Sequence, residues 1–285
     1  MRRTDPSIFL HRGKVGVLLL HGLGGTPVEM KNVARHLAGC GSTVLCPVLA
    51  GHCGTEADLK ATSWQDWYAS AENSLAALER ECSVVIVGGL SMGAVLAAML
   101  AARQPQRVHG LVMLAPTLWY DGWSIPWYSF LLKFALISPL GYWYRFVERE
   151  PYGLKDEMLR HVLVQSMFSG ESHMAGLEAT PSLALRELWR LVAALKPKLP
   201  STRQPALIVQ AREDDIASLA NLHYLQRRLG GLTESLILDD SYHLVTLDRQ
   251  RRLVMAKTAA FIDGVAERHL KARRQEHDRH EAAAE

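Results

Sequence analysis

The chain has 285 residues, 48% hydrophobic and 21% charged, with a formal net charge of +3. Its basic residues are scattered along the sequence, which argues against a nucleic-acid-binding protein, because such proteins gather Lys and Arg on one surface. No apolar run approaches the roughly 18 residues of a membrane-spanning helix and no signal peptide is apparent, so we expect one large cytoplasmic domain.

Short apolar runs rich in β-branched residues alternate with helical patterns along most of the chain. This alternation predicts an α/β fold with a mostly parallel sheet of about six or seven strands and helices on both faces. The expected strands are residues 7–10, 14–20, 43–46, 83–87, 108–114, 205–210 and 235–238. The expected helices are residues 28–38, 64–80, 94–102, 217–229 and 248–269.

Residues 117–200 interrupt the alternation, because helical patterns follow an aromatic start and no β-rich run is apparent. A structureless segment of that length is improbable inside a compact domain. We therefore predict a helical cap at 117–200, inserted into a core formed by residues 1–116 and 201–269. The charged tail, residues 270–285, is expected to be a frayed helix end or disordered.

The run Gly89-Leu90-Ser91-Met92-Gly93 follows an expected strand and precedes an expected helix. A Gly-x-Ser-x-Gly run in this context predicts a nucleophile elbow, because the small residues let the backbone turn sharply and expose the serine hydroxyl. Ser91 is therefore the candidate nucleophile. Serine alone reacts poorly, so this interpretation requires a base, an acid and oxyanion donors elsewhere in the chain.

The candidate base and acid follow the last two expected strands. His243 comes after the final strand, and Asp214 comes after the strand before it, with Asp215 as the rival acid. The carboxyl ends of parallel strands meet at one edge of a sheet, where α/β proteins place their sites. We predict that His243 takes the proton of Ser91 and that Asp214 holds the tautomer of His243. The order Ser, Asp, His along the chain is that of the α/β-hydrolases.

The oxyanion of a tetrahedral intermediate needs two rigid N–H donors. Met92 directly follows the nucleophile at a helix start, so its N–H is one candidate. The other is expected in the loop His21-Gly22-Leu23-Gly24, whose glycines allow a close backbone approach. We select the N–H of Leu23 from this loop.

Other polar residues near the expected site have simpler interpretations. His21 and His52 are expected to brace neighbouring loops through hydrogen bonds, and Asp248 is expected at a turn or a helix start. None of the cysteines has a Cys-x-x-Cys spacing, so we expect inert free thiols in a reducing compartment and no bound metal. The cysteines are Cys40, Cys46, Cys53 and Cys82.

The predicted cap is rich in aromatic residues. Trp119, Trp123 and Trp127 are candidates for the lining of an acyl pocket, and packing between cap helices is the alternative explanation. Weak contact of residues 119–134 with a membrane surface is a third interpretation, because aromatic residues beside an aliphatic run suit a lipid interface.

Six short motifs occur together and in order, and their combination is far more specific than any one of them. They are His21-Gly-Leu-Gly-Gly-Thr-Pro27, Pro47-Val-Leu-Ala-Gly-His52, Trp64-Gln-Asp-Trp67, Gly89-Leu-Ser-Met-Gly93, Ala211-Arg-Glu-Asp214 and Tyr242-His-Leu-Val-Thr-Leu-Asp248. With them the chain resembles the bacterial carboxylesterase and monoacylglycerol-lipase branch of the α/β-hydrolase superfamily. The resemblance covers residues 7–265 apart from much of the cap.

This resemblance implies serine-dependent hydrolysis of carboxylic esters, without a cofactor and with apolar acyl chains held under the cap. The expected partner is therefore a small-molecule or lipid ester. The resemblance also implies that Ser91, Asp214 and His243 form the catalytic triad and that Leu23 and Met92 donate to the oxyanion.

The chain departs from the family pattern at Cys53, where this branch usually has glycine, and in a longer, more aromatic cap. Substrate preference is therefore not carried over from the family. A thioesterase or acyltransferase with the same triad is the alternative function, because hydrolysis and transfer share an acyl-enzyme. A binding protein that kept the fold without the chemistry is a third hypothesis, which the presence of all three triad residues disfavours.

Overall fold

The computed structural model describes residues 5–126, 129, 144–147, 149–168 and 176–282. The strands of its main sheet are β1 (Ile8–Leu10), β2 (Val15–Leu20), β3 (Thr43–Cys46), β4 (Val84–Leu90), β5 (Gly110–Leu114), β8 (Ala206–Ala211) and β9 (Thr233–Leu238). Their spatial order is β1-β3-β2-β4-β5-β8-β9, and every neighbouring pair is parallel except β1 and β3. The predicted α/β fold and all seven expected strands are confirmed.

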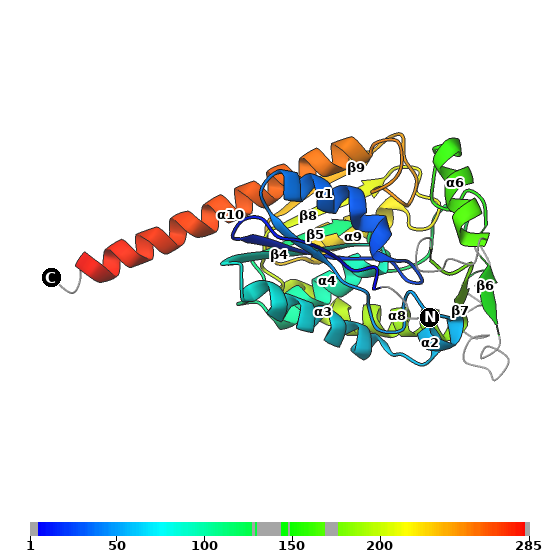
Figure 1. Ribbon diagram of the computed structural model, residues 1–285, viewed down its shortest axis with the longest axis horizontal. Helices are drawn as coiled ribbons and strands as arrows, with labels where there is room; N and C mark the ends of the chain where they lie inside the picture. The colour runs from blue at the N-terminus through cyan, green and yellow to red at the C-terminus, as the bar shows by residue number, and fades with distance from the viewer. Residues whose placement is uncertain (1–4, 127–128, 130–143, 148, 169–175, 283–285) are drawn as a thin grey trace.

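The central strands are buried on both faces, which explains why they read as continuous apolar runs instead of alternating patterns. One face of the sheet is covered by α1 (Lys31–Gly39) and α10 (Arg251–Ala282), which also contact each other (Figure 1). The opposite face is covered by α3 (Trp64–Glu79), α4 (Met92–Arg103), α8 (Ser182–Leu195) and α9 (Leu219–Arg228). Shorter helices are η1 (Pro27–Met30), α2 (Glu56–Lys60) and η4 (Lys196–Ser201).

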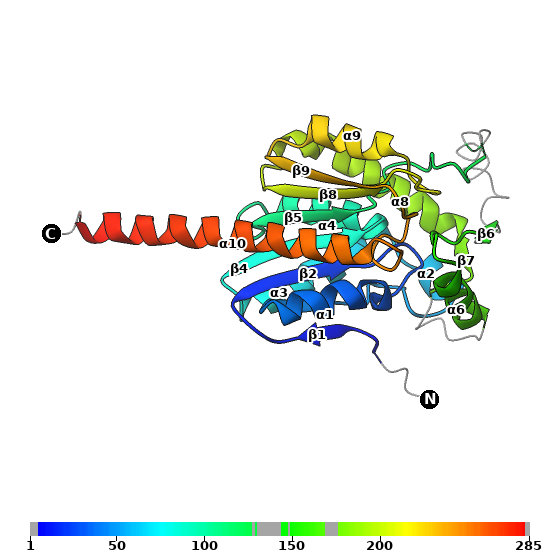
Figure 2. The same ribbon diagram turned by 90° about the horizontal axis from the view of Figure 1, so that it is seen from above.

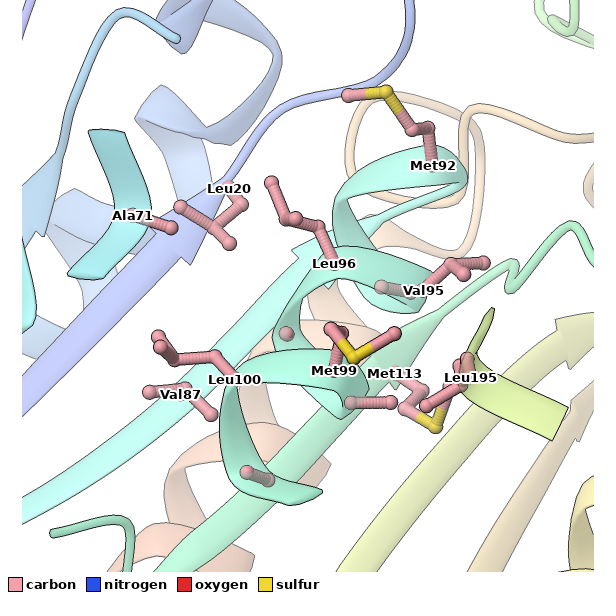
Figure 3. Packing of buried hydrophobic residues seen from close by; sticks show 14 of the residues in the cluster. Leu20, Ala71, Val87, Met92, Val95, Leu96, Met99, Leu100, Met113 and Leu195 are labelled. Atoms are coloured by element: carbon pink, nitrogen blue, oxygen red, sulfur yellow. The ribbon is translucent and has the colours of Figure 1, made fainter. Parts of the chain in front are cut away.

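The helix α4 lies at the centre of the larger hydrophobic cluster. Its residues from Met92 to Ala101 are all fully buried, as expected for a helix that is apolar around its whole circumference. Figure 3 shows Leu20 of β2, Val87 of β4 and Met113 of β5 beside it, together with Ala71 of α3 and Leu195 of α8. The helix start that carries the predicted elbow is therefore held rigidly from all sides.

The insertion comprises residues 115–181 between β5 and α8, and its described helix and strands lie at one end of the sheet (Figure 1). Its described elements are α6 (Glu157–Phe168) and a two-stranded antiparallel sheet of β6 (Arg145–Val147) and β7 (Ala179–Pro181). The two strands differ from the expectation of a purely helical cap, because three-residue strands are too short to produce a period-two pattern. The helix α8 falls within the expected cap range but packs against α3 and α4 over the main sheet.

The last helix, α10, starts at the same end of the sheet as the insertion and projects past the opposite end (Figures 1 and 2). Of the two alternatives left open for the tail, the structure has a helix, which continues to Ala282. Its residues up to Ala266 contribute to the core, and those from Glu267 to Gln275 are mostly exposed. Among the described helices, none combines the length and apolar character that crossing a bilayer requires.

Candidate active site

Ser91 occupies the sharp turn between β4 and α4. Its φ of 56° and ψ of −116° lie in a region that residues with a side chain rarely adopt. Glycines on both sides make the turn possible: a Cβ at Gly89 would overlap the backbone of Gly93, and a Cβ at Gly93 would overlap the carbonyl oxygen of Leu20. The turn thus presents the hydroxyl at the carboxyl edge of the sheet.

The side chains of His243 and Asp214 meet Ser91 at this edge, although His243 is 152 residues away in the sequence. The Nε2 atom of His243 lies 2.9 Å from the Ser91 Oγ, and its Nδ1 lies 3.0 Å from both carboxylate oxygens of Asp214. His243 and Asp214 are buried. The three residues that sequence analysis selected therefore form one continuous chain of hydrogen bonds.

Asp214 is itself held by several donors. One oxygen accepts the backbone N–H groups of Ile216 and Ala217 at 2.9 and 2.8 Å, and the other accepts the Gln210 amide at 2.6 Å. These bonds stabilise the ionised carboxylate and direct it toward Nδ1 of His243. A carboxylate can only accept there, so Nδ1 carries the proton and Nε2 is left free to take the proton of Ser91.

The electrostatic surroundings of His243 favour its protonated form. Burial of the imidazole lowers its pKa, but the charge and hydrogen bond of Asp214, with the charges of Asp215 and Glu29, outweigh burial and raise the pKa above 6.5. A base that gains a proton during the reaction is stabilised in that state by these carboxylates.

Asp215, the rival acid, has a different position. Its side chain accepts the backbone N–H of His243 at 3.2 Å and the backbone N–H of Gly153 at 3.1 Å. Burial raises the pKa of this carboxyl, an effect that the charge of His243 opposes. The structure therefore brings Asp214 to the imidazole and Asp215 to the main chain of the same histidine.

The loop after β2 runs beside the nucleophile. A Cβ at Gly22 would lie 3.7 Å from the Cβ of Ser91, which gives the close backbone approach expected of an oxyanion loop. The carbonyl of Gly22 accepts from His21 Nδ1 at 2.9 Å and from Gly25 N–H at 3.2 Å. Because the Gly22 carbonyl and the Leu23 N–H belong to one planar peptide, these bonds also fix the direction of that N–H. Met92 begins α4, where the first N–H groups have no partner within the helix.

Glu29 is a buried carboxyl that sequence analysis did not select. It accepts the N–H of Gly22 at 2.9 Å and occupies the space that a side chain at Gly25 would need. Burial raises the pKa of this carboxyl to about 7. Hydrogen bonds from Gly22 and Thr26 and the charge of His243 lower the pKa, but by less. The sequence contains no signal for this contact, because a glutamate in the first turn of a helix is ordinarily a solvent-exposed residue.

Thr117 is the second residue that sequence analysis missed. Its Oγ1 lies 3.1 Å from the Ser91 Oγ and 3.2 Å from the carbonyl oxygen of Ala115. The Ser91 hydroxyl therefore has two acceptors within reach, Thr117 and His243. This arrangement depends on the loop after β5 passing over the elbow, which no local pattern indicates.

The tryptophans selected as pocket candidates have other contacts. The indole N–H of Trp119 donates to Asp121 at 2.7 Å, and its ring packs edge-on against Tyr224. Trp123 is 58% exposed and donates to the carbonyl of Glu213 at 2.9 Å. Trp127 lies outside the described residues, as do 128 and 130–134 of the 119–134 stretch, so acyl binding and lipid contact stay predictions.

The two histidines expected to brace loops are buried against each other, with ring centroids 4.9 Å apart. His21 bonds to Gly22 and accepts from the N–H of Leu49 at 3.3 Å, and His52 bonds to the Ala50 carbonyl. Burial lowers the pKa of His21 to about 3 and that of His52 to about 4, so both are neutral structural groups near pH 7. In the part of the chain that the structure describes, no cluster of three His, Cys, Asp or Glu side chains is arranged to hold a metal ion.

Comparisons with known proteins agree with this geometry. A family model described as serine aminopeptidase, S33, matches residues 12–250. A thermostable monoacylglycerol lipase of Bacillus sp. (strain H-257) is 30% identical over 254 residues, 89% of this chain and 92% of the relative. A carboxylesterase of Bacillus subtilis (strain 168) is 24% identical over 266 residues, 92% and 98% of the two chains. A solved structure from work on the metagenome-derived lipolytic enzymes LipS and LipT has a TM-score of 0.75 at 28% identity, covering 90% of this chain and 97% of the other.

Proposed function

The chain belongs to the serine aminopeptidase S33 family of α/β-hydrolases and is a carboxylic ester hydrolase, and on this premise we propose that Ser91, His243 and Asp214 are its catalytic triad. The hydrogen-bonded chain from Asp214 through His243 to the Ser91 hydroxyl is the observation that carries the proposal. Its distances are those that a nucleophile, a general base and an orienting acid require.

The reaction follows from this geometry. As Ser91 Oγ attacks the ester carbonyl, its proton passes to Nε2 of His243, and Asp214 stabilises the imidazolium that forms. The N–H groups of Leu23 and Met92 donate to the oxyanion. The tetrahedral intermediate collapses to an acyl-enzyme on Ser91 when His243 gives its proton to the leaving alcohol. Water then attacks the acyl carbon while His243 takes its proton, and cleavage of the bond to Ser91 Oγ releases the acid as His243 returns that proton to Oγ.

The substrates we propose are small esters of apolar acyl chains, with monoacylglycerols as the first class to test. This choice is supported by two relatives that are similar to this chain over most of its length, a monoacylglycerol lipase and a carboxylesterase. We further propose that the insertion covers the acyl chain, because its base contacts the loop of His243 directly.

The deciding experiment replaces Ser91 with alanine and measures hydrolysis of p-nitrophenyl esters and monoacylglycerols of increasing chain length. We expect Ser91→Ala to lose about 10⁴-fold or more in kcat while its thermal midpoint stays close to the parent's. The matched control is Ser74→Ala, which removes a partly buried hydroxyl on α3 that bonds only to the Ser70 carbonyl. Full activity of Ser91→Ala would refute the proposed triad.

A further inference from the structure

The base of the insertion is joined to the loop that carries His243 by an unusually direct set of contacts. The carbonyl oxygen of Gly153 accepts the N–H of Leu244 at 2.8 Å. The N–H of Gly153 donates to the Asp215 carboxylate at 3.1 Å, and the other oxygen of that carboxylate accepts the N–H of His243 at 3.2 Å. One buried carboxylate thus bridges the insertion and the main chain of the histidine.

A second buried carboxylate repeats this bridge a few residues away. Asp248 is fully buried and accepts the N–H groups of Lys155 and Asp156 from the insertion at 3.0 and 2.9 Å. It also accepts the N–H of Tyr242, the residue before His243, at 2.6 Å. The expectation that Asp248 serves only as a turn or helix-start residue was therefore incomplete, because its carboxylate also joins two distant segments.

Gly153 leaves no free space against the histidine loop. Its φ of 71° is in the left-handed region, and a Cβ placed on it would lie 3.3 Å from His243 Cβ and 3.0 Å from the Leu244 side chain. The preceding residue, Tyr152, has a positive φ of 54°. The positive φ of Tyr152 is a strain that persists only where surrounding contacts over-determine the backbone, and the next residue, Gly153, lies directly against the loop of His243.

We propose that residues 153–156 of the insertion position His243 through Asp215 and Asp248, so that the insertion is a structural part of the general base's support as well as a cover for the acyl chain. Asp215 and Asp248 act as positioning residues, because they accept the main-chain N–H groups of His243 and Tyr242 and do not contact the reacting atoms. The inference rests on the proposed triad.

The physical reason is the narrow tolerance of proton transfer. The Nε2–Oγ distance of 2.9 Å must be maintained while His243 gains and returns a proton. In a loop without regular secondary structure, hydrogen bonds from the backbone N–H groups to fixed acceptors limit small displacements. Asp215 and Asp248 supply two of these acceptors, and each carboxylate also accepts N–H groups of the insertion.

The first test acts on the insertion and leaves every carboxylate in place. Gly153→Ala should press on His243 and lower kcat about 10- to 100-fold, as expected for a small misplacement of a catalytic group. The KM for a short ester such as p-nitrophenyl acetate should stay within about threefold, since the substrate does not depend on the base for binding. The matched control is Gly41→Ala, which also places a Cβ on a residue of positive φ, here 97°, but with open space around the site of the Cβ.

The second test removes one bridge. In Asp248→Asn only one oxygen remains, so donors from the insertion or from the histidine loop lose their acceptor. We expect a comparable fall in kcat, slower labelling of Ser91 by a small fluorophosphonate, and a shifted or broadened downfield NMR signal of the His243 Nδ1 proton. The control is Asp66→Asn, which removes a carboxylate that accepts from Ser63 at the start of α3.

The outcomes separate the inference from the proposed function. Loss of activity in Ser91→Ala together with wild-type kcat in folded Gly153→Ala and Asp248→Asn would overturn the inference and keep the triad. An unchanged Nδ1 signal in Asp248→Asn would also overturn it, even if the variant were less stable. Full activity of Ser91→Ala would instead refute the triad on which the inference depends.

Discussion

The two halves of the site are held in place by different forces. The elbow of Ser91 is held by close packing, because the apolar strand before it and the apolar helix after it are buried on all sides. Gly89 and Gly93 allow a turn in which a larger side chain would overlap the backbone. The loop of His243 is held by hydrogen bonds, in which buried carboxylates accept backbone N–H groups from segments distant in the sequence. The nucleophile therefore depends on shape, and the base depends on charge and hydrogen bonding.

This difference predicts different responses to substitution. Substitutions that add volume at the elbow should lower the stability of the fold, because a close-packed interior cannot make room for the added atoms. Substitutions near His243 that change charge but not size should lower the catalytic rate, because the loop keeps its shape while its hydrogen-bond acceptors change.

Among the substitutions that test this difference, the largest effect should come from Asp214→Asn, a change of charge at nearly constant volume. The amide would turn its NH₂ group toward Nδ1 of His243 and favour the tautomer with the proton on Nε2, which cannot accept the proton of Ser91. We expect kcat to fall about 10³- to 10⁴-fold with little change in the thermal midpoint. Steady-state kinetics on a p-nitrophenyl ester measure this, and Asp239→Asn, at an exposed carboxylate paired with Arg212, is the control. A fall below tenfold would contradict the assignment of Asp214 as the acid.

The next largest effect is expected from a substitution at the elbow that adds volume without a change of charge. Gly93→Ala would drive a Cβ into the carbonyl oxygens of Leu20 and His21. We expect the free energy of unfolding to fall by about 3 kcal/mol, measured by denaturant titration. Gly39→Ala, where no atom lies within 4 Å of the added Cβ, should leave stability nearly unchanged. Equal stability of the two variants would show that the elbow is not sterically determined.

A smaller effect, visible only as a function of pH, is expected at Glu29. Its pKa in the folded protein, about 7, exceeds its ordinary value of 4.5, so it contributes stability while protonated, and that contribution is lost as pH rises through 7. The neutral amide of Glu29→Gln has no such loss. The variant should therefore gain up to about 3 kcal/mol relative to wild type between about pH 5 and about pH 8. Urea unfolding at the two pH values measures this, and a difference independent of pH would contradict the burial of an ionisable carboxyl beside the oxyanion loop.

Most of the fold and the meeting of the three proposed triad residues were predictable because their signals are local. The runs that form β2, β4, β5 and β8 are apolar and bounded by turns, and Gly89 and Gly93 mark the elbow directly. Each residue of the proposed triad lies at or beyond the end of a strand, and parallel strands bring such residues to one edge of the sheet. Sequence reasoning therefore needed only the strand order to bring Ser91, Asp214 and His243 together.

The remaining features depend on contacts between segments that share no pattern. Glu29 becomes an active-site carboxyl only because the loop before it folds back on it, and Thr117 reaches Ser91 only through the path of the chain after β5. Asp215 was weighed as an alternative acid because sequence position alone cannot say which neighbouring carboxylate faces the imidazole. The three-residue strands β6 and β7 are held by pairing between segments more than 30 residues apart, which local propensity does not record.

The strand that precedes the catalytic histidine, β9, is at the edge of the sheet and pairs only with β8. During synthesis, the elbow and its surrounding helices leave the ribosome well before this strand is made. A nascent chain that ends before β9 contains Ser91 but lacks His243, its proposed proton acceptor. The proposed triad is therefore complete only after the last strand of the sheet has been made.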